Sequence, residues 1–271
     1  MKIVLPMAGR GSRFAGAEPS LPKPLIDVAG RPMVAWALES IQHVPCDQLV
    51  VVALAEHQHQ FHVGEIIKSF SPVEPQLVLL DDVTEGQLCT VMAARQWIDC
   101  DEDILVMSSD TFVLSDLAGD INRQSDCRGL VSVADMPGER WSFARTDEAG
   151  RVVEVAEKRR ISDHASTGMY YFSCGRDFVT CADEILNNGE KTKNEYYVIP
   201  VYQKFIQRGW PVGISVAQQM WDMGTPEALA AVTERLGQTA SYESTVSLQR
   251  IAAADCAPSR GVVFPKVGLG K

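Results

Sequence analysis

The sequence lacks any apolar run long enough to cross a bilayer and any cluster of basic residues. A membrane-spanning helix needs roughly 18 to 20 consecutive apolar residues, and the 271-residue chain, although 46% hydrophobic, contains no such run. Its 25 Lys and Arg residues face 35 Asp and Glu residues, a net charge of −10 that argues against a nucleic-acid-binding surface. The residues after Met1 lack the apolar segment and cleavage site of a signal peptide. We therefore expect a cytoplasmic protein that binds neither membrane nor nucleic acid.

Paired cysteines and a complete zinc motif are also absent. The seven cysteines are scattered, odd in number and form no Cys-x-x-Cys pair, which favours reduced thiols over a disulfide framework. His57, His59 and His62 lie close together, but no further ligand stands at a spacing typical of a zinc site. We interpret this segment as a solvated helix or loop.

The first part of the chain alternates predicted strands with predicted helices. Short β-rich apolar runs are separated by segments whose apolar residues recur with helical spacing. Such alternation indicates right-handed βαβ units and a mainly parallel sheet that is covered on both faces. The predicted strands are residues 2–7, 48–54, 76–80 and 103–107, and the predicted helices are residues 33–42, 57–70 and 88–97.

After Asp110 the pattern changes to strands that follow one another more closely, which indicates a mixed or antiparallel half. Helical spacing then returns, until a polar run weakens the signal from Gly237 onward. We predict one α/β domain over residues 1–236, a Rossmann-like mixed sheet flanked by helices, followed by a C-terminal extension over 237–271 with no assigned role. The predicted strands here are 129–134, 141–145, 152–156, 168–172 and 212–216, and the helices are 175–186, 195–207 and 226–236.

A glycine-rich segment directly follows the first predicted strand. From Leu5 to Phe14 it reads LPMAGRGSRF, and a turn of this kind exposes backbone N–H groups to phosphate oxygens. The dinucleotide fingerprint needs a third glycine where Phe14 stands, and the P-loop pattern does not fit either. Two cations follow instead, Arg13 and Lys23, and prolines on both sides stiffen the segment that carries Lys23. Two cations and a backbone cradle suit a triphosphate whose pyrophosphate leaves under attack at the α-phosphorus.

These residues resemble the opening signature of the nucleotidyltransferases that make sugar nucleotides, the nucleoside-diphosphate-sugar pyrophosphorylases, such as glucose-1-phosphate thymidylyl-, cytidylyl- and uridylyltransferases. That signature is Gly-x-Gly-x-Arg, then Pro-Lys-Pro and Gly-x-Pro, and it is met at residues 9–13, 22–24 and 30–32. The resemblance covers residues 1–236 and implies the nucleotide-diphospho-sugar transferase fold, which is GT-A-like. It implies catalytic roles for Arg13 and Lys23, and nucleotide contacts by Leu5, Met7, Ala8, Gly9, Arg10, Gly11 and Ser12.

Two aspartates match the positions at which this family binds Mg²⁺. Asp110 ends the predicted strand segment ILVMSSD, and Asp222 opens DMGTP, which is similar to the family's Asp-x-Gly-Thr-Pro element. Mg²⁺ typically takes one or two carboxylates together with phosphate oxygens, so the resemblance implies that both aspartates are ligands. Considered alone, Asp110 is equally typical of a strand-end cap, and Asp222 of a residue before a helix N-terminus.

Further matches concern the acceptor and the base. Glu157 and Lys158 resemble the family's Glu-Lys motif, which implies that Lys158 holds the acceptor's phosphate and Glu157 accepts hydrogen bonds from its hydroxyls; a solvated charge run is the alternative. Gln87 is the candidate for the base edge, although an ordinary helix N-terminus predicts the same residues. Tyr196 belongs to an element near the acceptor pocket in the family, although it also suits a core. The resemblance adds Trp141 and Gly168 as acceptor contacts and Ser109 as a nucleotide contact.

Departures from the family pattern gather around the acceptor. Trp141 and Ser142 stand where many sugar-specific members have Tyr-Gly, and Arg159 replaces the proline that commonly follows Glu-Lys. Near the nucleotide, Ser109 replaces a glycine, and Pro-Met-Ala precedes the first glycine in place of Ala-Ala. No hexapeptide repeat of a left-handed helix follows the matched region. These changes leave the residues that face the triphosphate in place.

We therefore expect a Mg²⁺-dependent enzyme that joins an NTP to a phosphorylated acceptor, most simply a sugar 1-phosphate, and releases pyrophosphate. A cytidylyltransferase for a non-sugar phosphate, such as phosphocholine in cell-surface polysaccharide modification, stays open. A glycosyltransferase of similar fold would want an Asp-x-Asp pair, whereas Thr111 and Phe112 follow Asp110. A nucleotide-binding regulator with a dead site would not need the retained cations and carboxylates. The base and the oligomeric state, a homo-oligomer included, are left open.

Overall fold

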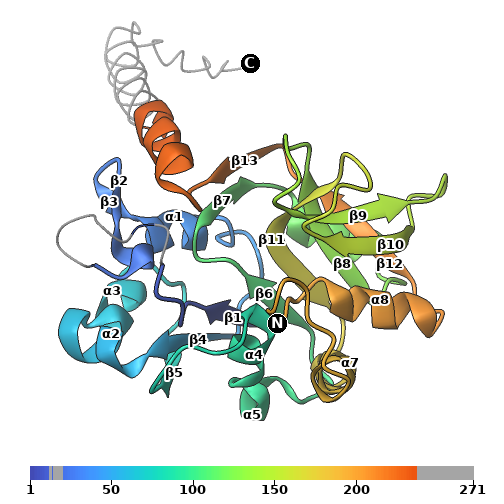
Figure 1. Ribbon diagram of the computed structural model, residues 1–271, viewed down its shortest axis with the longest axis horizontal. Coiled ribbons are helices and arrows are strands. Elements are labelled where there is room, and N and C mark those ends of the chain that lie inside the picture. Colours follow the sequence, from blue (N-terminus) through green and yellow to red (C-terminus); the bar gives the residue numbers. More distant parts are fainter. Residues whose placement is uncertain (12–13, 15–20, 237–271) are drawn as a thin grey trace, which may run out of the picture.

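A single mixed sheet forms the centre of the molecule (Figure 1). The structure, a computed structural model, describes residues 1–11, 14 and 21–236. In this part of the chain nine strands form the sheet, in the order β10, β9, β11, β6, β1, β4, β5, with β8 beside β11 and β12 beside β8. The strands are β1 (Lys2–Pro6), β4 (Gln48–Leu54), β5 (Pro75–Leu80), β6 (Ile104–Met107), β8 (Gly129–Ala134), β9 (Ser142–Thr146), β10 (Val152–Glu157), β11 (Ala165–Phe172) and β12 (Val212–Val216).

The half of the sheet built from the first part of the chain is parallel. Strand β1 pairs in parallel with β4 on one side and β6 on the other, and β4 pairs in parallel with β5. Six of the seven residues of β4 are buried, which is the continuous apolar pattern of a strand covered on both faces. The predicted βαβ layout is therefore confirmed.

The other half is mostly antiparallel, as the closer spacing of its strands predicts. Strand β11 runs antiparallel to β6, β8 and β9, and β9 and β10 form an antiparallel pair. Strand β12 returns parallel to β8. Because β11 lies beside β6, the chain around Gly168 comes close to the end of β6, next to Asp110.

Helices cover both faces of this sheet. One core cluster lies among α4, α5, α7 and α8, and a second lies among α1, α3 and α6. Figure 1 shows α7 and α8 against the mixed half and α2 and α3 near β4 and β5. The α/β fold with flanking helices is thus confirmed. The helices are α1 (Met33–Glu39), α2 (Ala55–Phe61), α3 (Val63–Lys68), α4 (Gln87–Met92), α5 (Arg95–Ile98), α6 (Leu117–Arg123), α7 (Gly175–Asn187) and α8 (Pro200–Gln207), and residues 226–236 are helical.

Three predicted helices are wrong in extent. The helix expected over 57–70 is two helices, because His62 adopts a left-handed conformation (φ 51°) and ends α2. The helix expected over 88–97 is divided between α4 and α5. The helix expected over 195–207 begins only at Pro200, because Tyr196 instead exchanges backbone hydrogen bonds with Glu85 and Leu88.

The sequence patterns also miss several short elements. Strand β7 (Thr111–Leu114) pairs with β13 (Gln219–Asp222) in a separate two-stranded sheet, which places Asp222 opposite Thr111. The ring of Trp221 stacks on Phe112 with centroids 4.6 Å apart, and both belong to an apolar cluster that reaches the helix at 226–236. A second small sheet joins β2 (Asp27–Val28) to β3 (Arg31–Pro32), and a 3-10 turn covers Lys23–Leu25. These short elements position Lys23 and Asp222, two residues of the candidate site.

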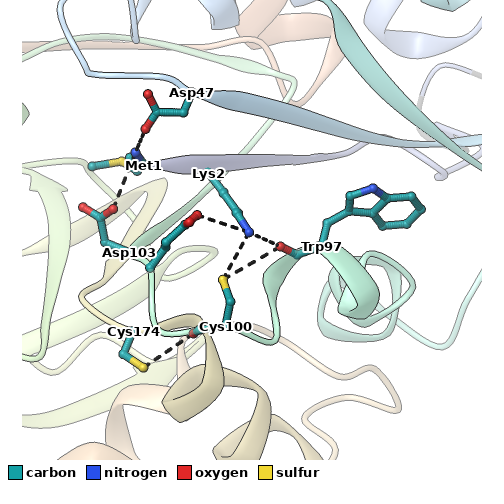
Figure 2. A network of polar contacts seen from close by, with 8 residues as sticks. Met1, Lys2, Asp47, Trp97, Cys100, Asp103 and Cys174 are labelled. Atoms are coloured by element: carbon teal, nitrogen blue, oxygen red, sulfur yellow. Dashed lines mark hydrogen bonds and ion pairs between the residues drawn. The ribbon is translucent and has the colours of Figure 1, made fainter.

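The amino end of β1 is tied to its neighbours by a polar network (Figure 2). Lys2 Nζ donates to Trp97 O (2.8 Å) and to Cys100 Sγ (3.2 Å), and the terminal amine of Met1 pairs with Asp47 and Asp103. These contacts fix the end of the sheet opposite to the glycine-rich loop. None of the helices in the described part of the chain combines the length and apolar character needed to cross a membrane.

Candidate active site

The glycine-rich loop leaves the carboxyl end of β1 and packs against the segment that carries Lys23. The side chains of Leu5 and Met7 are buried in the core, and Met7 N–H donates to Val52 O (2.8 Å), so a nucleotide would meet only backbone atoms of these two residues. Gly11 has φ +60°, and a methyl group there would lie 2.8 Å from Lys23 Cβ. Only glycine allows so close an approach in this conformation. The predicted contacts Ser12 and Arg13 lie outside the described residues.

A cavity of about 440 Å³, here named the loop cavity, opens beside this loop. Arg10 belongs to this loop and points to Asp82, with Nη2 and Oδ1 2.9 Å apart and both side chains exposed. Gly86, at φ +139°, lies against the backbone of Tyr196, where a methyl group would come within 2.4 Å of the Tyr196 carbonyl oxygen. This contact fixes the start of α4, at Gln87. The lining residues are Pro6, Ala8, Gly9, Val83, Thr84, Glu85, Gly86, Gln87, Thr90, Asn194 and Glu195.

Lys23 reaches across to the carboxylate of Asp110. Its Nζ lies 2.5 Å from Asp110 Oδ2 and 3.3 Å from the carbonyl oxygen of Gly224. The ammonium also lies 5.3 Å from the centre of the Phe14 ring. The lysine side chain is 16% exposed, so the ion pair is shielded from solvent more than a surface pair is. The structure thus brings together the cation after the glycine-rich loop and the predicted metal ligand at the end of β6.

Asp222 is held at the end of β13 and is nearly buried. Its Oδ1 accepts the N–H of Gly224 (3.0 Å), and its Oδ2 accepts a hydrogen bond from the guanidinium of Arg140. Met223 N–H donates to the carbonyl oxygen of Asp110 (2.9 Å), which ties the two aspartate segments together. Asp110 and Asp222 therefore share one site, although they lie far apart in the sequence.

The oxygen donors of these two carboxylates are of the kind that suits a small divalent cation. A methyl group on Gly224 would lie 2.8 Å from Asp222 Oδ1 and 3.5 Å from Asp110 Oδ2, so both carboxylates border the same small volume. Two carboxylates are what Mg²⁺ takes from a protein when substrate phosphates supply further oxygens. In the described residues no group of three or more His, Cys, Asp or Glu side chains could hold a metal, and a metal on this pair would depend on substrate or water for its remaining ligands.

A second cavity of about 460 Å³, here named the carboxylate cavity, contains both aspartates. It shares Gln87 and Glu195 with the loop cavity, so the two spaces meet at these side chains. Arg140 and Lys158 are the cationic side chains among its lining residues. The full lining is Gln87, Ser108, Asp110, Thr111, Arg140, Trp141, Ser142, Glu157, Lys158, Ser166, Thr167, Gly168, Tyr170, Glu195, Tyr197, Met220, Asp222, Gly224 and Thr225.

Hydroxyl groups and the half-buried carboxyl group of Glu157 line this cavity. Glu157 accepts a hydrogen bond from Ser142, and the hydroxyl of Tyr170 lies 3.4 Å from Ser142 Oγ. Burial raises the pKa of Glu157 above its usual value, against the opposing effects of the Ser142 hydrogen bond and the charge of Lys158. Burial and the charge of Glu157 raise the pKa of Tyr170 to about 12. These groups can exchange hydrogen bonds with the hydroxyls of a ligand.

Lys158 takes part in a network with Tyr197 and Glu195. The lysine Nζ and the Tyr197 hydroxyl are hydrogen bonded, the same hydroxyl donates to Glu195, and Nζ lies 4.0 Å from Glu195 Oε2. Lys158 has φ 52°, an uncommon conformation for a residue with a side chain, and its N–H donates to Trp141 O (2.9 Å). Strained backbone of this kind is often found at functional sites.

The position of Gly168 explains why a glycine interrupts β11. Its φ is +85°, and a methyl group there would lie 2.2 Å from Ser108 Oγ and 2.8 Å from Ser108 Cβ. The Ser108 N–H donates to the Gly168 carbonyl oxygen (2.9 Å). This contact fixes the chain leading to Asp110 against β11.

Some predicted site residues lie elsewhere than expected. Tyr196 is only 7% exposed and packs in the core, and its neighbour Tyr197 lines the carboxylate cavity instead. Ser108, and not Ser109, is among the lining residues of that cavity. The sequence patterns missed Arg140, because its only signal is that it stands directly before Trp141.

Comparisons with known proteins show the family of the chain and support its fold. The model of a protein family described as "Nucleotidyl transferase" matches residues 2–239. The chain is 28% identical over 213 residues to "Bifunctional protein GlmU" of Fervidobacterium nodosum, an alignment that covers 73% of this chain and 42% of the relative. The chain thus spans less than half the length of that curated relative.

Two further proteins are similar over nearly their whole length. The "UTP--glucose-1-phosphate uridylyltransferase AglF" of Haloferax volcanii is 23% identical over 250 residues, covering 87% of this chain and 96% of the relative. A crystal structure of a nucleoside-diphosphate-sugar pyrophosphorylase from Vibrio cholerae superimposes with a TM-score of 0.73 at 26% identity, covering 86% of this chain and 99% of that one.

Proposed function

The chain belongs to the nucleotidyl transferase family, and from this we propose that it transfers a nucleotidyl group from an NTP to a sugar 1-phosphate and releases pyrophosphate. The observation that carries the proposal is the meeting of two cavities. The loop cavity lies beside the glycine-rich loop, and the carboxylate cavity contains Lys158, Asp110 and Asp222. A triphosphate along the loop would bring its α-phosphorus toward a phosphate held in the second cavity, and such alignment is the main requirement of phosphoryl transfer.

In the proposed reaction an oxygen of the acceptor's phosphate attacks the α-phosphorus of the NTP. A new phosphorus–oxygen bond forms as the bond to the bridging β-phosphate oxygen breaks, and pyrophosphate leaves with that electron pair. Lys23 would bind the α-phosphate as charge develops on it, Arg13 would bind the β- and γ-phosphates, and Lys158 would hold the acceptor's phosphate. Gln87, at the junction of the cavities, is the candidate for contacting the base.

We include Mg²⁺ as the cofactor in this proposal. Asp110 and Asp222 would hold the ion, since both carboxylates border the volume beside Gly224. A Mg²⁺ ion bound there would act as a Lewis acid and neutralise negative charge on the phosphate groups. Lys23 and Arg140 pair with these two carboxylates and would be freed to act on phosphate groups.

The lining of the carboxylate cavity favours a sugar over a cationic acceptor such as phosphocholine. A quaternary ammonium group binds well against an aromatic face, but the Arg140 guanidinium already lies 4.2 Å from the centre of the Trp141 ring. A second cation there would be repelled. Ser142, Glu157 and Tyr170 instead offer hydrogen-bonding groups that suit a polyhydroxyl ring.

The test is pyrophosphate release with Mg²⁺ across the common NTPs, each paired with a panel of sugar 1-phosphates and with phosphocholine. Turnover with one sugar 1-phosphate, lost in Lys23→Ala, would support the proposal. Turnover with phosphocholine and no sugar phosphate would overturn the assignment of the acceptor. Binding of NTP without turnover for any pair would overturn the transferase activity and favour a regulator.

A further inference from the structure

Arg140 lines the carboxylate cavity, but the proposed reaction does not say which phosphate group it binds. Its guanidinium pairs with Asp222 on one side and covers the Trp141 ring on the other. The arginine side chain is 43% exposed, whereas that of Asp222 is 8% exposed. A nearly buried carboxylate is thus neutralised by a cation that can reach solvent and ligand.

The loop that carries Arg140 is anchored on both sides of it. Arg160 donates from Nη1 to the carbonyl oxygens of Met136 (2.7 Å) and Gly138 (3.3 Å). Trp141 Nε1 donates to Pro137 O (3.0 Å). The backbone and the indole are therefore held in place, and a change of partner by Arg140 requires only movement of its own side chain across a fixed aromatic surface.

A divalent cation bound to Asp222 would compete with Arg140 for the same carboxylate. Both are positive charges competing for one carboxylate of low exposure, and their mutual repulsion is strong where solvent screening is weak. Linkage makes the opposition reciprocal: the ion weakens the Arg140 pair by the same factor by which Arg140 weakens binding of the ion.

The acceptor's phosphate needs a second cation in this cavity. A phosphate monoester carries a charge of about −1.5 to −2 at neutral pH, and Lys158 supplies one positive charge, which is already shared with Glu195. Arg140 is the other cationic side chain that lines the cavity. Its planar guanidinium can donate two parallel hydrogen bonds to phosphate oxygens.

We propose that Arg140 is a phosphate-binding residue that exchanges partners: it pairs with Asp222 in the metal-free protein and binds the acceptor's phosphate once a divalent cation occupies Asp222. This inference rests on the proposed function for the identity of the anion. The exchange couples metal binding to acceptor binding, since the cation both displaces Arg140 and makes it available to the phosphate.

The test compares Arg140→Gln with the wild type and with Arg123→Gln. Arg123 is a matched control, because it is an exposed arginine of α6 that pairs with Asp120 and with Asp116, the residue before the helix. The first measurement is Mn²⁺ binding without substrates, by electron paramagnetic resonance. Removing Arg140 should tighten Mn²⁺ binding by about fivefold or more, within the usual range of coupling between sites. A purely structural role for Arg140 would leave Mn²⁺ binding unchanged or weaken it, and either result would overturn the proposal.

The second measurement is calorimetric binding of inorganic phosphate at saturating Mn²⁺. Arg140→Gln should weaken phosphate binding about tenfold, the loss of one charge-assisted pair, and Arg140→Lys should fall between the two because it keeps the charge but not the planar fork. Equal phosphate affinity in wild type and Arg140→Gln would overturn the exchange. Both measurements omit NTP and sugar, so they stand even if the acceptor panel shows no turnover, which would overturn only the proposed function.

Discussion

Replacing Gly168 by alanine tests how tightly β11 is joined to the segment between β6 and Asp110. Two separate penalties are expected. Positive φ costs an L-residue about 1 to 2 kcal/mol, and the new methyl group would overlap Ser108, for which overpacking adds about 1 to 3 kcal/mol. The free energy of unfolding should therefore fall by about 2 to 5 kcal/mol in Gly168→Ala.

A matched glycine separates the two penalties. Gly30 has φ +84°, nearly the +85° of Gly168, but a methyl group on it would meet nothing within 4 Å. Gly30→Ala should lose only about 1 to 2 kcal/mol, the conformational part. In a Ser108→Gly background, which removes the overlapping atoms, Gly168→Ala should cost about as little as Gly30→Ala.

Urea unfolding followed by circular dichroism measures these differences, with equal m-values required for the comparison. The double-mutant cycle should give a coupling of about 1 to 3 kcal/mol between positions 108 and 168. If Gly168→Ala costs no more than Gly30→Ala, or costs the same with and without Ser108, the close approach of the two segments is refuted.

Three further substitutions test the chemistry of the site. Lys23→Ala should lower turnover by about 10²- to 10³-fold, as removal of a preorganised charge does. The control Lys68→Ala removes a surface lysine paired with Glu74 and should leave turnover unchanged. Similar turnover in the two variants would show that Lys23 is not part of the site. Asp222→Asn should weaken Mn²⁺ binding and abolish metal-dependent turnover, and unaltered metal dependence would contradict a ligand role. Burial raises the pKa of the Glu157 carboxyl group, so this group binds its proton more tightly in the folded state than in the unfolded state. As the pH rises above 4.5, the pKa of the carboxyl group in the unfolded chain, ionisation of Glu157 therefore destabilises the fold. Glu157→Gln should therefore gain stability relative to wild type between pH 4 and 7 in thermal melts, and a constant difference across that range would contradict the burial effect.

The elements predicted best are those whose sequence pattern and surroundings agree. Strands β4, β8 and β12 match their predicted bounds. For β4 and β8 the reason is that nearly every residue is buried, which gives a mostly apolar run. The helix expected at 195–207 failed at its start, where tertiary hydrogen bonds from Tyr196 override a helical pattern. Short strands such as β7, with four residues, carry too little periodicity to be recognised without their partner β13.

The residues of the candidate site also fall into two groups, those that the sequence predicts and those that only the structure reveals. Lys23, Asp110 and Asp222 were identified because their residue types and order match a known family, and the structure brings the three together. Arg140 and Tyr197 also reach this cavity, although Arg140 matches no motif and the family element around Tyr196 does not say which of its two tyrosines lines the cavity. Their positions depend on the pairing of distant segments, which periodicity and spacing do not encode.

The pairing of each candidate ligand with its own cation makes a last prediction about metal removal. Asp110 is neutralised by Lys23 and Asp222 by Arg140, so each of these two carboxylates keeps a cationic partner when the metal is absent. A chelator should therefore leave the melting temperature of the wild type unchanged, in contrast to structural metal sites, whose proteins unfold without the ion. In Lys23→Ala the carboxylate of Asp110 loses its partner, and saturating Mg²⁺ should raise the melting temperature of this variant more than that of the wild type, since binding to the folded state alone stabilises it. Differential scanning calorimetry with EDTA and with Mg²⁺ measures both effects. Unfolding of the wild type by EDTA would show that the ion, and not the two side-chain cations, balances the charge of the carboxylates in the folded state.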